Sequence, residues 1–281
     1  MSALAKTFND PTQPSYRLWQ STVAIFIFLS CIALALETVS DIEVRFHTEF
    51  LIVEWVSVAI FTVDYLGSLM YSEDKAKYAF SVWGIIDLVS ILPSYLMLLN
   101  LTALQGTKVL RLLRVARVLR VLKLARTAIA EQDGEQNPIL VNLRIYFIIF
   151  FSVMMISSTA MYFFEGGLYS PDAMAAGQQV LDAQAQAAGT EPEKFMPIDP
   201  MSGNPIPEDK RFFTSIPTAM WWCIVTLTST GYGDMFPVTG GGRIIAGITM
   251  FLGLVLFGIL LNVIGKTLMV VLFGEKLKSG D

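Results

Sequence analysis

The amino-acid sequence predicts an all-α membrane protein, and three observations carry that prediction. The chain has 281 residues, of which 54% are hydrophobic and only 16% charged, whereas soluble domains carry about 25% charged residues. Its first long apolar segment, Leu18 to Leu36, holds 19 residues without a charge, which is enough to cross a bilayer as a helix. Further apolar segments of similar length recur along the chain, so we expect a bundle of membrane-spanning helices.

Six apolar segments are long enough to span a membrane. Five follow the first, over residues 50–71, 80–101, 107–130, 145–164 and 244–265. The polar residues before Leu18 and the sequence Ala33-Leu34-Ala35 also fit a signal peptide with its cleavage site. The five later segments favour a first membrane span instead.

The distribution of charge orients these spans. Six spans place both termini on one side, and the basic residues near span ends gather on that side, which marks it as cytoplasmic; they are Lys75, Lys77, Arg126, Arg144, Lys266, Lys276 and Lys278. The loop over residues 165–211 carries eight acidic residues, beginning with Glu165, and is predicted to be exposed outside with at most a short helix near 173–188. We therefore expect a multi-pass protein of the plasma (cell inner) membrane, with a cytoplasmic N-terminus (1–17) and tail (275–281).

A short apolar segment and a glycine-rich run precede the last span. Residues 212–228 are too few to cross a bilayer, and irregular backbone at membrane depth is tolerated only inside protein or beside a water-filled cavity. This pattern predicts a re-entrant helix and loop. Gly231 and Gly233 permit dihedrals that let successive carbonyls point the same way, and rings of such carbonyls replace the hydration shell of a potassium ion. One strand supplies one carbonyl per ring, so such a pore needs four copies.

A ladder of cations runs through the fourth apolar segment. A basic residue occurs at every third position, separated only by Val, Leu or Ala: Lys108, Arg111, Arg114, Arg117, Arg120, Lys123 and Arg126. On an α-helix this spacing makes the charges spiral around the axis, whereas in a 3₁₀-helix, with three residues per turn, they align in one row. From Arg111 to Arg126 an α-helix rises about 22 Å, close to the hydrocarbon thickness of a bilayer.

Cations at membrane depth need partners, because an unpaired charge there is costly. Glu54 and Asp64 lie in the second segment with Phe61 between them, and Asp87 lies in the third. We expect an aromatic plug flanked by carboxylates, which lets the cations pass singly while each stays paired. The alternative is a surface helix that binds anionic lipid or nucleic acid, but a basic amphipathic helix leaves one polar face and does not repeat every three residues.

These segments together resemble voltage-gated potassium channels. The resemblance rests on Ser-Ile-Pro-Thr-Ala-Met-Trp-Trp at 215–222, Val-Thr-Leu-Thr-Ser-Thr-Gly-Tyr-Gly-Asp-Met at 225–235 and Pro-Val-Thr at 237–239. It also rests on the acids and phenylalanine named above, on Pro93 and on the ladder. It covers residues 18–273 apart from the loop 166–211. It implies six transmembrane helices per subunit of a homotetramer, divided into a four-helix voltage sensor (18–130), a linker (131–143) and a pore domain (144–274) with an extracellular turret (166–211) and a pore helix and filter (212–235).

The resemblance also implies roles for individual residues. The selectivity filter comprises Thr228, Ser229, Thr230, Gly231, Tyr232, Gly233 and Asp234, with potassium ions at Ser229, Thr230, Gly231 and Tyr232. Trp221 and Trp222 support it, with Tyr232 against the tryptophans and Trp221 bonded to Asp234. The seven ladder cations are gating charges, Glu54, Asp64 and Asp87 their countercharges, and Phe61 the plug. Gly253 is either a hinge or a site of close helix packing, and Asn262 either lines a narrowing near the gate or bonds within its helix.

Three features depart from the family pattern. Ser229-Thr230 replaces Thr-Val, which keeps the inner hydroxyl and adds one at Thr230 that needs a partner; we expect that partner in the pore helix. Leu260-Leu261-Asn262 stands where many animal members have Pro-Val-Pro, as in prokaryotic members. Gly134 and Pro138 interrupt the acidic linker, so a continuous coupling helix is not expected unless Pro138 begins one.

Other functions fit less well. A sodium or calcium channel would carry a carboxylate where Gly231-Tyr232-Gly233 stands, a proton-conducting sensor would lack the last two helices, and an enzyme would need a catalytic domain. The nearest alternative is a ligand-gated or weakly selective relative; we expect no cyclic-nucleotide-binding domain, because eight residues follow Phe273. The outer loop forms a disordered turret or an acidic vestibule. Potassium ions and membrane lipids are the expected partners, with no other cofactor and no nucleic acid.

Overall fold

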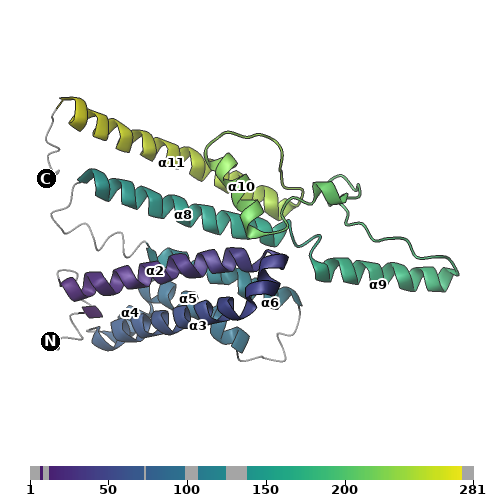
Figure 1. Ribbon diagram of the computed structural model, residues 1–281, viewed down its shortest axis with the longest axis horizontal. Helices are drawn as coiled ribbons and strands as arrows, with labels where there is room; N and C mark the ends of the chain where they lie inside the picture. Colours follow the sequence, from purple (N-terminus) through teal and green to yellow (C-terminus); the bar gives the residue numbers. More distant parts are fainter. Residues whose placement is uncertain (1–6, 9–12, 73, 99–106, 125–137, 274–281) are drawn as a thin grey trace.

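The computed structural model describes residues 7–8, 13–72, 74–98, 107–124 and 138–273, and the structural statements below concern these residues. Within them the chain is all-helical apart from its loops (Figure 1), as the composition predicted. The residues where the first long helix begins (Pro14) and the last one ends (Phe273) lie at one end of the molecule, which we call the terminal end. The loop over residues 165–215 lies at the other, which we call the loop end.

The first half of the chain forms a bundle, which we call the N-terminal bundle. Two long helices, three shorter ones and a 3₁₀ segment make it up: α2 (Pro14–Glu37), α3 (Ser40–Tyr71), α4 (Lys75–Ala79), α5 (Val82–Leu98), α6 (Thr107–Ala116) and η2 (Arg117–Lys123). The cation ladder thus begins as an α-helix and continues as a 3₁₀-helix. In the second part a residue spacing of three aligns side chains in one row.

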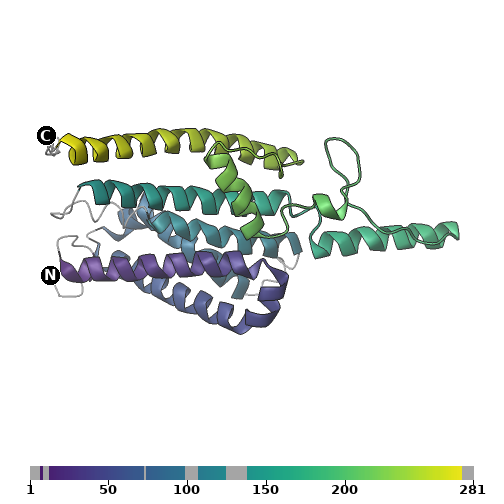
Figure 2. The same cartoon turned by 45° about the horizontal axis from the view of Figure 1, so that its top comes forward.

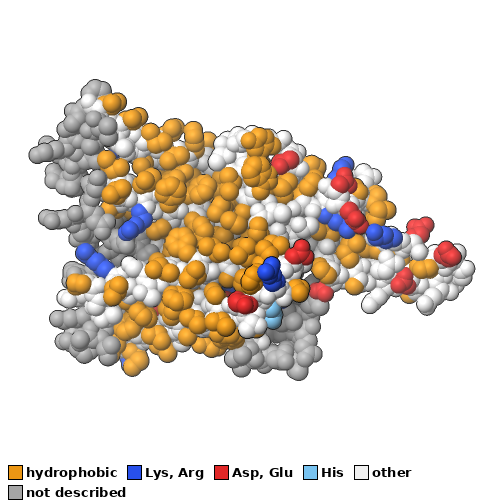
Figure 3. Space-filling view, in the orientation of Figure 1, with side chains coloured by type: hydrophobic (Ala, Val, Ile, Leu, Met, Phe, Trp, Pro, Cys, Tyr) orange, Lys and Arg blue, Asp and Glu red, His pale blue; other side chains and the backbone are white. Residues whose placement is uncertain are grey.

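The second half is built on two long helices that lie side by side, α8 (Pro138–Phe164) and α11 (Gly240–Phe273). The shorter α10 (Ile216–Leu227) packs against both near the loop end, and α9 (Pro171–Ala188) projects beyond that end (Figures 1 and 2). The described part of the chain contains four helices long and apolar enough to cross a membrane, over Pro14–Glu37, Ser40–Tyr71, Ile139–Phe164 and Gly240–Met269. Figure 3 shows hydrophobic side chains over the face that these helices form, as expected for a surface in contact with lipid.

Two hydrophobic cores hold these halves together. One is centred in the N-terminal bundle, includes Ile27 and Phe61 and extends to Met155 on α8. The other joins α8, α10 and α11 and includes Met161 and Cys223. The halves meet where α6 and η2 lie against α8 and where α2 meets the start of α10, with a further contact between α2 and α8. There the Phe28 and Phe151 rings are 4.6 Å apart between centroids, and the backbone N–H of Ile216 donates to Thr38 Oγ1 at 2.8 Å.

Two expectations from the sequence were wrong. The second long helix begins at Ser40 rather than Phe50, because Asp41 and Glu43 in its first turn favour the positive end of the helix dipole; a kink at Phe46 (φ −120°, ψ 27°) separates this extension from the span. Glu165 is not an exposed loop acid. It is 1% exposed, because the backbone N–H groups that lead into α11 bind its carboxylate.

The outer loop is more ordered than a disordered turret. Its predicted short helix is present as α9, which begins with Ser170 as N-cap and ends at Gly189 with a positive φ of 66°. Gln178 on this helix binds the segment of the loop that follows it. Its Oε1 accepts from the N–H of Phe195 at 2.8 Å, and its Nε2 donates to the carbonyl of Glu193 at 3.1 Å. The loop therefore carries its own internal packing.

Candidate functional site

The short helix α10 is fixed at its N-terminal end by a capping box. Ser215 is the N-cap, its hydroxyl accepts from the N–H of Thr218, and the Thr218 hydroxyl accepts from the N–H of Ser215. Pro217 lies in the first turn, where its missing N–H costs nothing. These caps satisfy the free donors of a short helix, so α10 delivers its C-terminal end to a defined place beside α11.

The backbone after α10 alternates in the way the glycine-rich sequence predicted. Ser229, Gly231 and Gly233 have positive φ angles of 58°, 58° and 75°. Within the described chain Ser229 is the one non-glycine residue with a positive φ, a conformation that costs about 1–2 kcal/mol for an L-residue with a Cβ. The N–H groups of Thr230 and Gly231 both point back to the carbonyl of Val225, at 3.0 and 3.3 Å. The run is therefore anchored to the last turn of α10.

The hydroxyl of Thr230 finds its partner at the C-terminal cap of α10. It lies 2.9 Å from Thr228 Oγ1. Thr228 Oγ1 itself donates to the carbonyl of Ile224 at 2.8 Å. Because a hydroxyl has one proton, Thr230 is the donor and Thr228 the acceptor of the shared bond. The extra hydroxyl that distinguishes this chain from the family pattern is thus satisfied locally.

Trp221 and Trp222 occupy different environments. The Trp221 ring stacks on the Tyr232 ring, with centroids 5.9 Å apart and an interplanar angle of 8°, and its Nε1–H donates to Asp234 Oδ2 at 2.8 Å. Trp222 instead points into the protein and meets Phe213 edge to face. Trp221 is therefore the tryptophan whose ring stacking and hydrogen bond support the glycine-rich run.

Glu165 joins the end of α8 to the start of α11. Its Oε2 accepts from the N–H of Val238 at 3.0 Å, and its Oε1 accepts from the N–H and the hydroxyl of Thr239 at 2.9 and 2.6 Å. A carboxylate at a helix N-terminus is favoured by the helix dipole as well as by these bonds. The bonds hold the segment between the glycine-rich run and α11 against α8.

Gly253 lies where α11 crosses the end of α10. A Cβ at this position would lie 2.8 Å from the carbonyl oxygen of Leu227 and 2.9 Å from its Cα. This close backbone approach gives a physical reason for glycine here that requires no hinge. Asn262, two turns further along α11, is exposed in the single chain.

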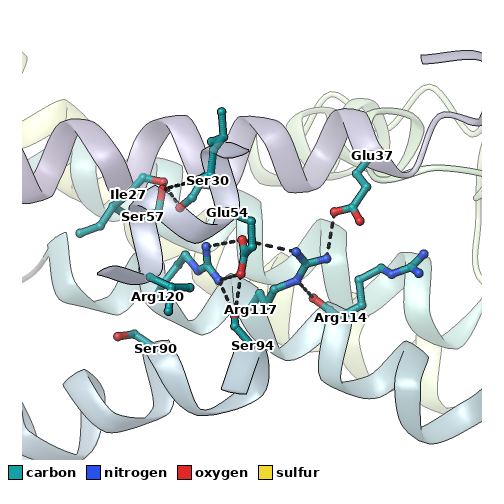
Figure 4. Close-up of polar contacts among 12 residues, drawn as sticks. Ile27, Ser30, Glu37, Glu54, Ser57, Ser90, Ser94, Arg114, Arg117 and Arg120 are labelled. Carbon is teal, nitrogen blue, oxygen red and sulfur yellow. Dashed lines mark hydrogen bonds and ion pairs between the residues drawn. The ribbon is translucent and has the colours of Figure 1, made fainter. Parts of the chain in front are cut away.

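The part of the ladder nearer the loop end is held by carboxylates from two helices (Figure 4). Arg120 binds both oxygens of Glu54, at 2.9 and 2.8 Å, and Arg117 binds Glu37 Oε2 at 2.9 Å while lying 3.3 Å from Glu54 Oε2. The Ser94 hydroxyl also donates to Glu54, at 2.5 Å. Both arginine side chains are buried. The attraction within each ion pair must therefore offset the free energy of desolvating both charges.

The part nearer the terminal end is held by two aspartates that share one lysine. Lys123 Nζ lies 2.9 Å from Asp64 Oδ2 and 2.9 Å from Asp87 Oδ1. The ring of Phe61 separates this pair from the arginine pairs: Arg120 Cζ lies 5.7 Å from its centroid and Lys123 Nζ 5.2 Å. The cations therefore sit on both sides of one buried aromatic ring.

The other ladder residues are described less fully. Arg114 is exposed, Lys108 and Arg111 belong to α6 with side chains outside the described set, and Arg126 lies outside the described residues altogether. The linker residues 131–137, which include Gly134, also lie outside the described residues. Pro138 is the first residue of α8, a position where proline is favoured.

Sequence reasoning missed several partners of these sites. Glu37 and Glu165 each directly follow an apolar segment without charge, and that position at a span end was a signal for both. Ser94, Trp19 and Tyr78 carry no such signal, because their contacts join residues 40, 45 and 9 positions apart through helix packing.

Comparison with known proteins identifies the family. The sequence profile described as "Ion transport protein" matches residues 16–271. A protein of Rhodopseudomonas palustris with the provisional name potassium channel protein RPA4233 is 24% identical over 256 residues, which are 87% of this chain and 52% of the relative.

Two human relatives agree with this. The voltage-gated potassium channel KCNC3 of Homo sapiens is 30% identical over 77% of this chain and 26% of the relative. The voltage-gated potassium channel regulatory subunit KCNG3 of Homo sapiens is 26% identical over 92% of this chain and 57% of the relative. The chain thus spans between about a quarter and somewhat more than half of these relatives, and the resemblance to voltage-gated potassium channels is confirmed at the level of sequence similarity. The chain belongs to the family of ion transport proteins.

Proposed function

We propose that this chain is one subunit of a potassium-selective channel that membrane voltage opens and closes. One observation carries the proposal: a single chain combines a backbone of alternating positive φ after α10 with a row of cations paired on both sides of a buried ring. The first feature suits dehydrated cations and the second suits a charge that moves through the membrane. The names of the relatives, which refer to potassium channels, agree with both.

Conduction requires four copies of the run over residues 228–234. Potassium ions, the transported substrate, would bind between rings of carbonyls at Ser229, Thr230, Gly231 and Tyr232, each chain supplying one carbonyl per ring. Tyr232 is 68% exposed in the single chain, which suits a residue that neighbouring subunits cover. A homotetramer is the assembly we propose; the relative named as a regulatory subunit makes a mixed tetramer the alternative.

Gating uses the ladder. Six spans arise when α5 and the α6–η2 ladder are added to the four long helices, and the loop end then faces outside while both termini are cytoplasmic. In this orientation Arg117 and Arg120 lie outward of Phe61 and Lys123 lies inward of it. A step of three residues toward the cytoplasm would bring Arg120 to the aspartates that now hold Lys123. Each charge moved across 100 mV is worth about 2.3 kcal/mol.

Recording from the purified full-length protein in a planar bilayer tests the proposal. With potassium on one side and sodium on the other, we expect a reversal potential close to that of a potassium-selective pore and a conductance that changes steeply with voltage. Gly231→Ala is the control, because it forces a Cβ onto a backbone with φ of 58° and should abolish the current. Comparable sodium and potassium currents would contradict selectivity, and a conductance independent of voltage would contradict gating.

A further inference from the structure

The two aspartates that share Lys123 each bind a second, uncharged donor. Trp19 on α2 donates its Nε1–H to Asp64 Oδ1 at 2.8 Å, and Tyr78 on α4 donates its hydroxyl to Asp87 Oδ2 at 2.6 Å. Lys123 Nζ approaches the other oxygen of each carboxylate. Each aspartate therefore offers one oxygen to the cation and one to a neutral ring.

Both donors are held by packing rather than by the cation. The Trp19 ring meets Phe8 edge to face at 5.5 Å, and Phe8 in turn stacks on Tyr71 at 6.1 Å. The Phe8 ring fills the space above Gly67, where a Cβ would lie 2.6 Å from it. The Tyr78 ring rests on Tyr65 at 6.4 Å, in a helix capped by the Asp74 side chain. The donors would keep their places if the ladder moved.

A lysine and an arginine place different demands on such a pair of carboxylates. An ammonium is a compact charge that binds one oxygen of each carboxylate, whereas a guanidinium is a planar fork that prefers both oxygens of one carboxylate. The chain shows the second mode at Glu54, where Arg120 binds both oxygens. At Asp64 and Asp87 the neutral donors already occupy the oxygens that a fork would need.

We propose that Trp19 and Tyr78 make the aspartate pair selective for lysine over arginine, and so favour the sensor position in which Lys123 occupies it. The proposal rests on the proposed gating function. On inward movement Arg120 would have to displace the neutral donors or bind through one oxygen per aspartate. The two rings therefore stabilise the outward position of the ladder relative to every position that puts an arginine between the aspartates. Trp19 and Tyr78 are positioning residues, since they act through the carboxylates.

The test measures how sensor charge moves with voltage in the full-length channel. Trp19→Phe and Tyr78→Phe each remove one donor and keep the ring. We expect the charge–voltage curve of each variant to shift to more positive potentials, with the ratio of outward to inward sensors at a fixed voltage falling by about threefold to tenfold per lost hydrogen bond. Tyr65→Phe is the matched control, because no described hydrogen bond involves its hydroxyl, and should leave the curve unchanged.

The decisive arm repeats both substitutions in a Lys123→Arg background. An arginine then occupies the aspartates in the outward position as well, so removing a donor should no longer shift the curve. An equal shift in both backgrounds would show that the rings only support the fold, and a shift toward negative potentials would reverse the assignment; either result overturns the inference. If Trp19→Phe fails to assemble, Tyr78→Phe alone decides. Absence of any voltage-driven charge movement in the unmodified channel would instead count against the proposed function.

Discussion

Arg120 lies at the centre of the cation ladder and Tyr232 at the centre of the glycine-rich run, but one is buried within the single chain and the other is exposed. Arg120 is 1% exposed and is bound by Glu54 from a neighbouring helix, whereas Tyr232 is 68% exposed and has one ring, Trp221, against it. The N-terminal bundle satisfies its charges within the chain because an unpaired buried charge would unfold it. The glycine-rich run instead leaves Tyr232 largely exposed, as expected if ions and neighbouring subunits of the proposed channel contact it. The comparison indicates that the bundle completes its structure within one chain, whereas under the proposed function the glycine-rich run completes its structure only in a tetramer.

The largest expected effect tests the bundle. Glu54→Gln removes the charge that Arg117 and Arg120 share, and we expect a loss of about 3–5 kcal/mol in the stability of the bundle, because buried Arg120 then loses its carboxylate partner while Arg117 keeps only Glu37. Thermal unfolding of the detergent-purified protein, followed by circular dichroism, measures it. Glu208→Gln is the control, since its pair with Lys194 is exposed and pairs of this kind contribute little to stability. Equal unfolding temperatures of the two variants would contradict the inference that the buried ion pairs stabilise the bundle more than an exposed pair does.

The next effect tests the contact between α10 and α11. Gly253→Ala places a Cβ against the backbone of Leu227, which has no flexible side chain to yield, and overpacking of this kind costs about 1–3 kcal/mol. We expect the tetramer to dissociate at a lower temperature, as measured by size-exclusion chromatography after heating. Gly258→Ala, with no atom within 4 Å of the added carbon, should be neutral or gain up to about 1 kcal/mol from helix propensity. Similar losses at both positions would favour a hinge role for helix glycines over close packing at Gly253.

The smallest effect tests the filter. Trp221→Phe keeps a ring against Tyr232 but loses the hydrogen bond to Asp234, and we expect a loss of about 0.5–1.5 kcal/mol in the stability of the proposed tetramer, with the N-terminal bundle unaffected. The measurement is the difference in tetramer dissociation temperature between potassium and sodium solutions. Trp55→Phe on α3 serves as the control in the bundle. If Trp221→Phe lowered the stability of the bundle and left the tetramer unchanged, the proposed difference between the bundle and the glycine-rich run would be wrong.

Much of the fold was predictable because its signals are local. Apolar length predicts the long helices. The spacing of three left two arrangements open, a spiral on an α-helix or one row on a 3₁₀-helix, and η2 adopts the second. Gly231 and Gly233 predicted the positive φ angles around them. The beginning of α3 was predicted wrongly, because a polar first turn extends a helix without lengthening its apolar run.

The sequence by itself determined which residues are charged, which backbone positions tolerate a positive φ, and where helices long enough for a membrane lie, since these follow from composition and periodicity along one segment. Only the tertiary structure decided which acid meets which cation. The pair of Arg117 with Glu37 joins residues 80 positions apart, and the bond of Trp19 to Asp64 joins residues 45 apart. The tertiary structure also places the Trp222 side chain in the interior and buries Glu165. The physical reason is that such contacts depend on the rotation and axial register of each helix against its neighbours, which packing sets and local periodicity does not.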